Sequence, residues 1–240
     1  MESPNGNPVT ATVSGHKSVK IRADHLIPIL KFVVWGTHET LDRTVRMQKK
    51  APTNVPLLSA IATRWSPRAF DARSIPVADR EGCLEAARWA PSSMNDQPWF
   101  FVWVDRDDTK AFEAALECLV PFNQDWAKRA GALCFGLVRP LFAYNQEPNP
   151  HAEYDLGQSV AQLALEATHR GLFVHQMGGF EPARVEARFV LPEGFRPHVA
   201  LAIGYFGDIA TLPEPLQERE NAARQRKRND ELWNPGTLSE

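Results

Sequence analysis

The chain has 240 residues, which is long enough for one domain with a substantial buried core. Its 43% hydrophobic and 23% charged residues are the proportions of an ordinary globular protein and argue against a wholly disordered or membrane-embedded one. The 29 acidic and 27 basic residues nearly balance, so net charge gives no support to a nucleic-acid partner.

The N-terminal segment differs in composition from the rest of the chain. Residues 1–20 are rich in Ser, Thr, Gly, Asn and Pro and are predicted to be disordered. Residues 25–46 are predicted to form a helix, whose apolar run is broken by a proline and a lysine and is about half as long as a membrane crossing requires. That run also begins too far into the chain for a signal peptide. We therefore expect an extension at 1–54, a single domain at 55–240, and no membrane partner.

Beyond residue 55 the hydrophobic pattern changes between helical and extended segments. Helices are predicted at residues 56–63, 78–90, 107–118, 155–170 and 181–189, and strands at 99–104, 132–138 and 198–206. The helix at 155–170 has the clearest periodicity, and Gly171 supplies its C-terminal stop. Helices interspersed with few strands imply a mixed α+β domain. The proline-containing stretch at 139–152 is predicted to be a long loop, either a lid or a surface excursion.

Several common site chemistries lack support in the sequence. The 3 cysteines are far apart and include no Cys-x-x-Cys, which favours buried thiols and a reducing, cytoplasmic location. The 7 histidines include no His-x-x-x-His pair, so no metal site is predicted. Ser92 and Ser93 are not part of a Gly-x-Ser-x-Gly elbow, which argues against a hydrolase.

A polar turn at residues 90–99, Ala-Pro-Ser-Ser-Met-Asn-Asp-Gln-Pro-Trp, lies between a predicted helix and a predicted strand. Its serines and asparagine offer short hydrogen-bonding groups held by rigid elements, which is typical of a ligand-binding loop. The alternative is a plain helix-to-strand connection with Asx and Ser turns.

A second polar cluster precedes this turn, at residues 64–70, Arg-Trp-Ser-Pro-Arg-Ala-Phe. The two clusters, in this order and at this spacing, resemble the corresponding motifs of the FMN-dependent nitroreductases. The resemblance spans residues 56–235 and continues through further short segments. They are Phe122-Asn123-Gln124, Tyr154-Asp155-Leu156-Gly157, Gly171-Leu172, His175-Gln176-Met177-Gly178-Gly179-Phe180, Ala202-Ile203-Gly204-Tyr205 and Arg224-Gln225-Arg226-Lys227.

The resemblance implies a fold and an activity. The fold is the nitroreductase-like α+β fold, with a central, mostly antiparallel sheet flanked by helices in an intertwined homodimer. The activity is electron transfer from NAD(P)H through bound FMN to nitroaromatic, quinone or similar acceptors, by a ping-pong mechanism. Because FMN carries the hydride chemistry, no acid, base or nucleophile of the protein is predicted to be catalytic.

The FMN phosphate requires fixed cations, because the sequence lacks both glycine-rich phosphate-binding motifs. Guanidinium groups offer paired donors that match phosphate oxygens. The resemblance assigns this role to Arg64, Arg224 and Arg226. Considered without the resemblance, the basic tail is more typical of a solvated charge run.

The resemblance also assigns residues to the rest of the cofactor. Arg68 is expected to be a cation near flavin N1 that favours the reduced ring. The Gly178-Gly179 turn is expected to bring backbone N–H groups to flavin N5, unless it is an ordinary turn. The loop of Pro91, Ser92, Ser93 and Asn95 is expected to reach the flavin of the opposite subunit. The remaining expected cofactor-binding residues are Trp65, Ser66, Asn123, Gln176 and Met177.

Other activities remain open at this level. One alternative keeps the fold and flavin with different chemistry, namely a flavin destructase, a dehalogenase or an azoline oxidase. Another is a flavin-binding protein without turnover.

Overall fold

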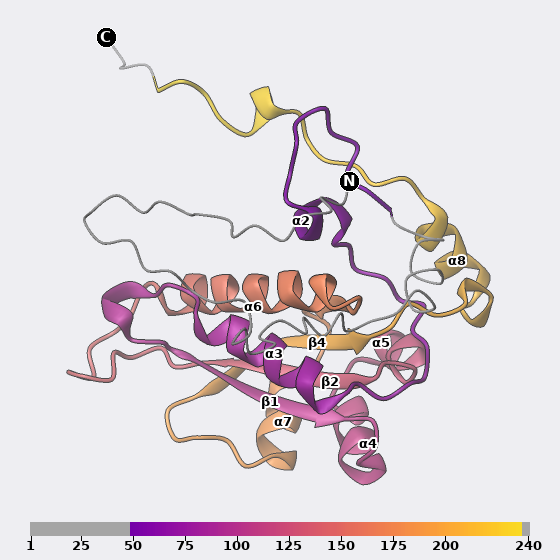
Figure 1. The fold of residues 1–240 in the computed structure, drawn as a ribbon. Helices are drawn as coiled ribbons and strands as arrows, with labels where there is room; N and C mark the ends of the chain where they lie inside the picture. Colours follow the sequence, from indigo (N-terminus) through magenta and orange to yellow (C-terminus); the bar gives the residue numbers. More distant parts are fainter. Residues whose placement is uncertain (1–48, 237–240) are drawn as a thin grey trace, which may run out of the picture. The chain divides into compact units, whose positions relative to one another are not determined.

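A computed structural model describes residues 49–236 of the chain (Figure 1). The predicted disorder at 1–20 and the predicted helix at 25–46 lie outside these residues. In chain order the main helices and strands are α2 (Ser59–Thr63), α3 (Val77–Arg88), β1 (Trp99–Asp105), α4 (Thr109–Glu117), α5 (Pro121–Ala127), β2 (Ala132–Val138), α6 (Ala152–His169), β3 (Phe173–Met177), α7 (Pro182–Arg188), β4 (Arg196–Gly204) and α8 (Glu214–Asn221). Short 3-10 turns lie at Ser93–Asn95, Ile209–Thr211 and Asn229–Glu231.

The strands form a 4-stranded sheet in the order β1-β2-β4-β3, and every neighbouring pair is antiparallel. The predicted antiparallel sheet is therefore confirmed. Strand β2 is buried along its whole length, which fits its nearly continuous apolar sequence. Its register with β4 shifts between Gly136 and Leu137. A side chain at Gly136 would place Cβ 2.9 Å from Val199 Cγ1, so glycine permits the close approach of the two strands there.

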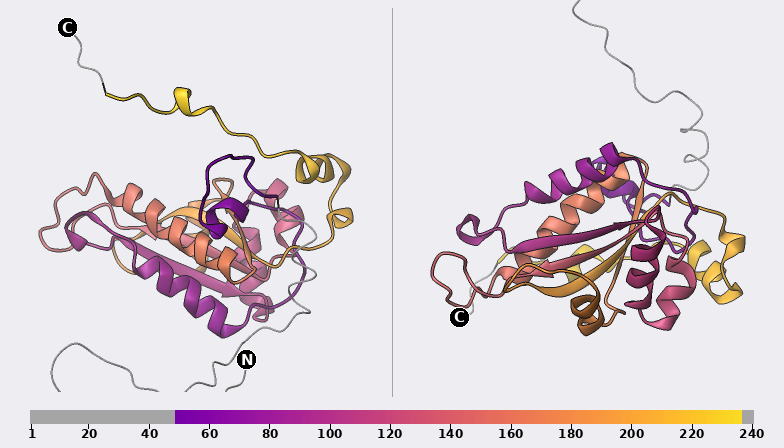
Figure 2. Two further views of the ribbon diagram at one scale, coloured as in Figure 1. Left: turned by 45° about the horizontal axis from the view of Figure 1, so that its top comes forward. Right: turned by 90° about the horizontal axis from the view of Figure 1, so that it is seen from below.

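Helices α3 and α6 lie on one face of the sheet and α4 and α7 on the other, as Figures 1 and 2 both show. Alternation along the strands supplies a separate core to each face. Leu156, Val160 and Leu163 of α6 pack in the first core, and Phe112 and Phe135 belong to the second. Each such side chain contributes on the order of 1.5–3 kcal/mol by burial. The sheet therefore has a packed core and covering helices on both of its faces.

Helix α6 follows its predicted boundaries closely. It begins at Ala152, ahead of the predicted residue 155, and ends at His169. Gly171 has φ +77°, the left-handed conformation that ends a helix and that glycine adopts without strain. No helix among the described residues is both long and apolar enough to span a membrane.

Three short elements were not predicted, and each has a weak local signal. Strand β3 has only 5 residues and contains a histidine and a glutamine. Helix α5 begins at a proline and has a polar sequence, and α8 is highly charged with a weak apolar face.

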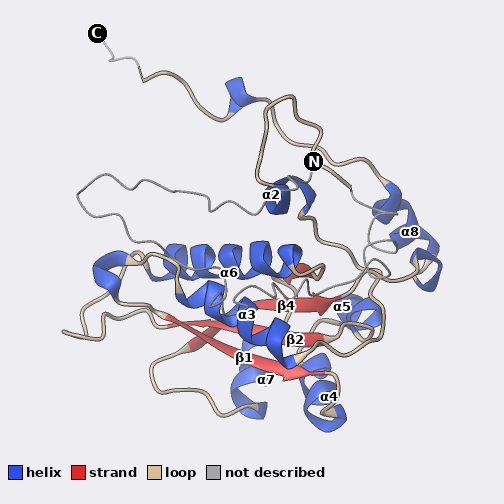
Figure 3. Cartoon of the chain, viewed as in Figure 1, coloured by secondary structure: helices blue, strands red, loops and turns tan. Residues whose placement is uncertain are grey.

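Between β2 and α6 the chain is a loop, drawn tan in Figure 3. A bridge between Leu141 and Pro148 gives this loop an ordered, hairpin-like form.

Candidate functional site

The early motif and the C-terminal tail enclose a hollow of about 280 Å³. It lies where the chain leaves α2, beside α8 and the segment that follows α8. The residues that line it are Lys49, Arg64, Trp65, Ser66, Arg68, Arg219, Glu220, Ala222, Ala223, Arg224 and Arg226. The structure thus brings Arg64, Arg224 and Arg226 to one place from opposite ends of the domain. We call this the cationic hollow.

The charges of the cationic hollow are crowded. Burial lowers the pKa of Arg64, and the nearby charge of Arg226 lowers it further. Burial likewise lowers the pKa of Arg224, followed by the charges of Arg64 and Arg226. Among residues 49–236, no carboxylate lies within ion-pair distance of these three arginines. An anion placed between them would relieve their mutual repulsion.

The three arginines differ in how much of their hydrogen-bonding capacity the protein uses. Arg224 Nη1 donates to the carbonyl oxygens of Lys49 at 2.7 Å and Ala62 at 2.8 Å, so it also fastens the tail to α2. Arg64 makes a 3.4 Å contact to Ser66 Oγ, and Arg226 donates only to the neighbouring Gln225 carbonyl at 2.7 Å. Arg64 and Arg226 therefore retain the larger share of donors for a ligand.

Buried donors without a partner also occur in this hollow. Trp65 is 7% exposed, and its Nε1 has no hydrogen-bond acceptor, nor has Arg68 Nε. The Lys49 ammonium lies 4.6 Å from the centre of the Trp65 ring. Unsatisfied buried N–H groups are rare in proteins and demand an explanation. Together with the crowded cations, they fit a ligand that carries a phosphate and further acceptor oxygens.

Two residues that the sequence did not single out for a role hold the early motif in place. Glu220 Oε1 accepts hydrogen bonds from the backbone N–H groups of Arg68 and, at 2.7 Å, Ala69. On the other side, His175 Nδ1 lies 2.8 Å from the Pro67 carbonyl oxygen, so Nδ1 carries the proton and donates. Both side chains are buried. A glutamate in a charged helix and a histidine in a five-residue strand give no sequence signal for this task.

A second hollow, of about 340 Å³, lies over β3, β4 and α6. Its lining residues are Glu153, Leu156, Gly157, Val160, Gln176, Met177, Gly178, His198 and Val199. A Cβ atom at Gly157 or Gly178 would meet no other atom within 4 Å, so both glycines leave open space. The hydrogen bond between His175 and Pro67 joins strand β3, which lines this hollow, to the motif that lines the cationic hollow.

The Gly178-Gly179 turn packs directly on α5. Asn123 Nδ2 donates to the Gly179 carbonyl at 2.9 Å, and a Cβ at Gly179 would lie 2.6 Å from that nitrogen. A side chain at 179 would therefore displace the Asn123 amide, whereas Gly178 faces the second hollow. The contact of Asn123 with a flavin ring stays a prediction, since its amide already holds the turn.

The Ser92–Gln97 loop has an unusual backbone. Met94, Asn95 and Gln97 have φ values of 55°, 54° and 49°, in the left-handed region that non-glycine residues seldom adopt. Ser92 Oγ accepts from the Gln97 N–H at 3.0 Å, and the Ser93 N–H donates to Asp155 Oδ2 at 3.0 Å. Strained backbone of this kind clusters at functional sites. The loop contains the Ser turn expected of a simple helix-to-strand connection. It also contains strained backbone, which such a connection does not require.

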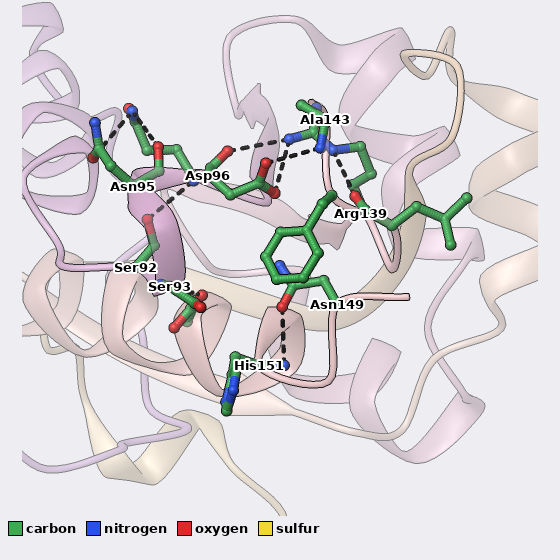
Figure 4. Close-up of polar contacts among 12 residues, drawn as sticks. Ser92, Ser93, Asn95, Asp96, Arg139, Ala143, Asn149 and His151 are labelled. Carbon is green, nitrogen blue, oxygen red and sulfur yellow. Dashed lines mark hydrogen bonds and ion pairs between the residues drawn. The ribbon is translucent and has the colours of Figure 1, made fainter. Parts of the chain in front are cut away.

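Asp96 anchors this loop to the one between β2 and α6 (Figure 4). Its side chain is only 2% exposed and pairs with Arg139 Nη2 at 3.1 Å. Asp96 Oδ1 also accepts from the Ala143 N–H at 2.8 Å. The two loops therefore form one connected unit. Pro91, Ser92, Ser93 and Asn95 line neither hollow of their own chain.

Comparison with known proteins identifies the family. Residues 61–205 match the family model described as the Nitroreductase family. The chain belongs to the nitroreductase family. A crystal structure described as an oxidoreductase containing FMN is 32% identical and superposes with a TM-score of 0.73, covering 80% of this chain and 98% of that one.

Two further comparisons carry less weight. A putative nitroreductase from Desulfovibrio desulfuricans, solved in complex with FMN, superposes with a TM-score of 0.61. The match covers 78% of this chain and 100% of that one, but at 20% identity it shows a shared fold alone. An uncharacterized 15.4 kDa protein of Mycolicibacterium smegmatis is 43% identical over 76 residues, which is 32% of this chain and 51% of that protein. The chain thus spans about half the length of this curated relative.

In this nitroreductase-family chain, we expect His175 to make stability depend on pH. Burial lowers the pKa of His175 from 6.5 to about 4, and Arg68 adds to the effect while the Pro67 carbonyl opposes it. Because the unfolded chain binds this proton more tightly, we expect the contribution of His175 to stability to be complete above pH 6.5 and to be lost as the pH drops toward 4. At roughly 1.4 kcal/mol for each pKa unit, the loss is on the order of 3 kcal/mol.

Urea unfolding of the apoprotein between pH 7.5 and 4 measures this loss. In His175→Asn the amide can donate to Pro67 but does not titrate, so we expect its stability to change less over this range than that of the wild type. His151→Asn, at an exposed histidine, is the control and should retain the wild-type slope. Equal slopes in all three proteins would contradict the assignment to His175.

Proposed function

We propose that this protein binds FMN and transfers electrons from NAD(P)H to nitroaromatic, quinone or similar acceptors. The observation that carries the proposal is the cationic hollow, where Arg64, Arg224 and Arg226 converge beside unpartnered buried donors. The donors of the cationic hollow suit a terminal phosphate. FMN has such a phosphate, whereas riboflavin does not. The 32% identity to an FMN-containing oxidoreductase, over 98% of that chain, supports the same cofactor.

The residues divide between the parts of the cofactor. Arg64 and Arg226 would hold the phosphate through paired donors, with Arg224 fixing the tail. Trp65 Nε1 and Ser66 would face the phosphate or the ribityl chain, and the Gln176–Gly179 turn would face the ring. When bound, FMN supplies the hydride chemistry. Arg68 would stabilise negative charge on the pyrimidine side of the ring.

An absorbance spectrum of the purified protein tests the proposal. We expect the yellow spectrum of bound FMN, bleached under anaerobic conditions by NADPH or NADH and restored by a quinone or nitroaromatic acceptor. Bound FMN that neither nucleotide bleaches would favour the same fold with other chemistry, or flavin binding without turnover. Absence of FMN binding would overturn the proposal.

We further propose that the functional unit is a homodimer with a flavin site at its interface. The Ser92–Gln97 loop lines neither the cationic hollow nor the second hollow, and its tip residue Met94 is 75% exposed. Other large apolar side chains on the described surface are also exposed, among them Trp89 and Tyr154. A second subunit would cover such residues and receive the loop.

Sedimentation velocity at micromolar concentration checks this prediction. We expect a dimer whose interface buries more than about 2,000 Å², the range of obligate homodimers. Met94→Asp should weaken the dimer by placing a charge in that interface. Val190→Asp is the control, because Val190 is 98% exposed and comes just after α7, a helix on the face of the sheet opposite α6. A fully active wild-type monomer would exclude the dimeric site.

A further inference from the structure

Glu220 is a carboxylate within the hollow that we assign to a phosphate. Glu220 lies near the end of α8 and is 1% exposed. Every other ionised side chain that lines the hollow is a cation. A negative charge at this place repels the proposed ligand, so it weakens phosphate binding relative to a neutral side chain of the same shape. A buried charge of this kind requires a compensating role.

The geometry supplies the first part of that role. Glu220 Oε1 accepts from the N–H groups of Arg68 and Ala69, the two residues that follow the Ser66-Pro67 step of the early motif. Meanwhile His175 holds the Pro67 carbonyl from the sheet side. The turn that carries Arg68 is therefore fixed between α8 and β3, and neither hydrogen bond uses the Arg68 side chain.

The charge of Glu220 supplies the second part. Its carboxylate acts favourably on the Arg68 guanidinium and on the Lys49 ammonium, whereas Arg219 acts unfavourably on Arg68. The guanidinium lies 5.9 Å from the centre of the Trp126 ring, and its Nε has no partner. Arg68 is thus anchored through its backbone and partly neutralised through space by the same carboxylate.

We propose that Glu220 is a positioning residue that fixes the Arg68 turn and, by partly offsetting the charge of Arg68, holds down the reduction potential of the bound flavin. This inference rests on the proposed FMN site. The two effects of the Glu220 side chain have different origins. Its hydrogen bonds depend on an acceptor oxygen, and the offset of the Arg68 charge depends on a negative charge.

Glu220→Gln and Glu220→Ala separate the two effects in the full-length protein. Glutamine keeps an acceptor oxygen without the charge, so FMN should bind at least as tightly as in the wild type. The ratio of the dissociation constants of oxidised and reduced FMN should rise by up to about tenfold, which is a positive shift of about 30 mV for a two-electron couple. Alanine leaves the backbone N–H groups of Arg68 and Ala69 without this acceptor, so the FMN dissociation constant should increase about tenfold.

Fluorescence titration measures the dissociation constants, and spectroelectrochemistry measures the potentials. Glu218→Gln is the matched control, because Glu218 is an exposed carboxylate on the same helix and should change neither quantity. In an Arg68→Met background, Glu220→Gln should still raise the potential, because the Glu220 charge acts on the flavin whether or not residue 68 is charged. A merely structural role would not shift the potential in either background.

The outcomes distinguish this inference from the function on which it rests. If the wild type fails to bind FMN, the proposed function and this role both fall. If the wild type binds FMN but Glu220→Gln has the potential of Glu218→Gln, the charge offset is wrong while the FMN site stands. Loss of the shift in the Arg68→Met background would also overturn it, because the shift would then depend on the Arg68 side chain and not on the Glu220 charge. Should Glu220→Ala not fold, the glutamine variant still decides the question.

Discussion

Alanine in place of Arg64 or Arg226 should weaken FMN binding by about 1.5–3 kcal/mol, the range of a hydrogen bond to a charged group. Both guanidinium groups line the cationic hollow, and the protein itself uses few of their donors. The double variant should lose less than the sum of the single losses, because removing one arginine also relieves the repulsion that lowers the pKa of Arg64.

Titration of apoprotein with FMN, followed by flavin fluorescence, measures these losses. Arg226→Lys should give an intermediate affinity, because an ammonium keeps the charge but not the paired donors. Arg228→Ala is the control, since this exposed arginine already pairs with Asp230 at 2.8 Å. High salt should reduce the wild-type affinity more than that of the double variant. An unchanged affinity in Arg226→Ala would mean that the tail is only a solvated charge run.

The elements that could be predicted from the sequence are those with strong local signals. Helix α6 has a long apolar stripe and a glycine stop, and β1 and β2 are rich in aromatic and β-branched or other apolar residues. Strand β3 is short and polar enough to resemble a loop, and it forms a strand because β4 offers it a complete antiparallel partner. Its structure is determined by pairing with a distant segment rather than by its own residues.

The candidate site likewise contains residues that a local sequence pattern identifies and residues that only the tertiary structure identifies. The motifs at residues 64–70 and 90–99 could be recognised by their spacing, but the convergence of Arg64 with Arg226 rests on a tertiary contact that no local pattern contains. Glu220 was missed because its partners are backbone N–H groups, which every sequence possesses. Likewise, the link between Asp96 and the loop after β2 depends on two loops meeting in space.

Methionine in place of Arg68 should slow reduction of the bound flavin about 100-fold, the order observed when a single preorganised charge-stabilising donor is removed from an active site. The methionine has a similar length but no charge to offer a ring that gains negative charge on reduction. Because Arg64 and Arg226 would still hold the phosphate, FMN affinity should fall much less than the rate. Interactions that strengthen only as charge develops affect rate more than binding.

Stopped-flow reduction of FMN-saturated wild type and variant, with NADPH and with NADH, measures the effect. Arg68→Lys should recover much of the rate, because the charge near the pyrimidine side is restored even though the guanidinium geometry is lost. The order Arg, Lys, Met in rate, with nearly constant FMN affinity, is the pattern expected of a cation that tunes the flavin. Equal rates in wild type and Arg68→Met would remove Arg68 from that role. If neither nucleotide reduces the wild type, the defect lies in the oxidoreductase assignment itself, and flavin binding without NAD(P)H turnover becomes the better account of the cationic hollow.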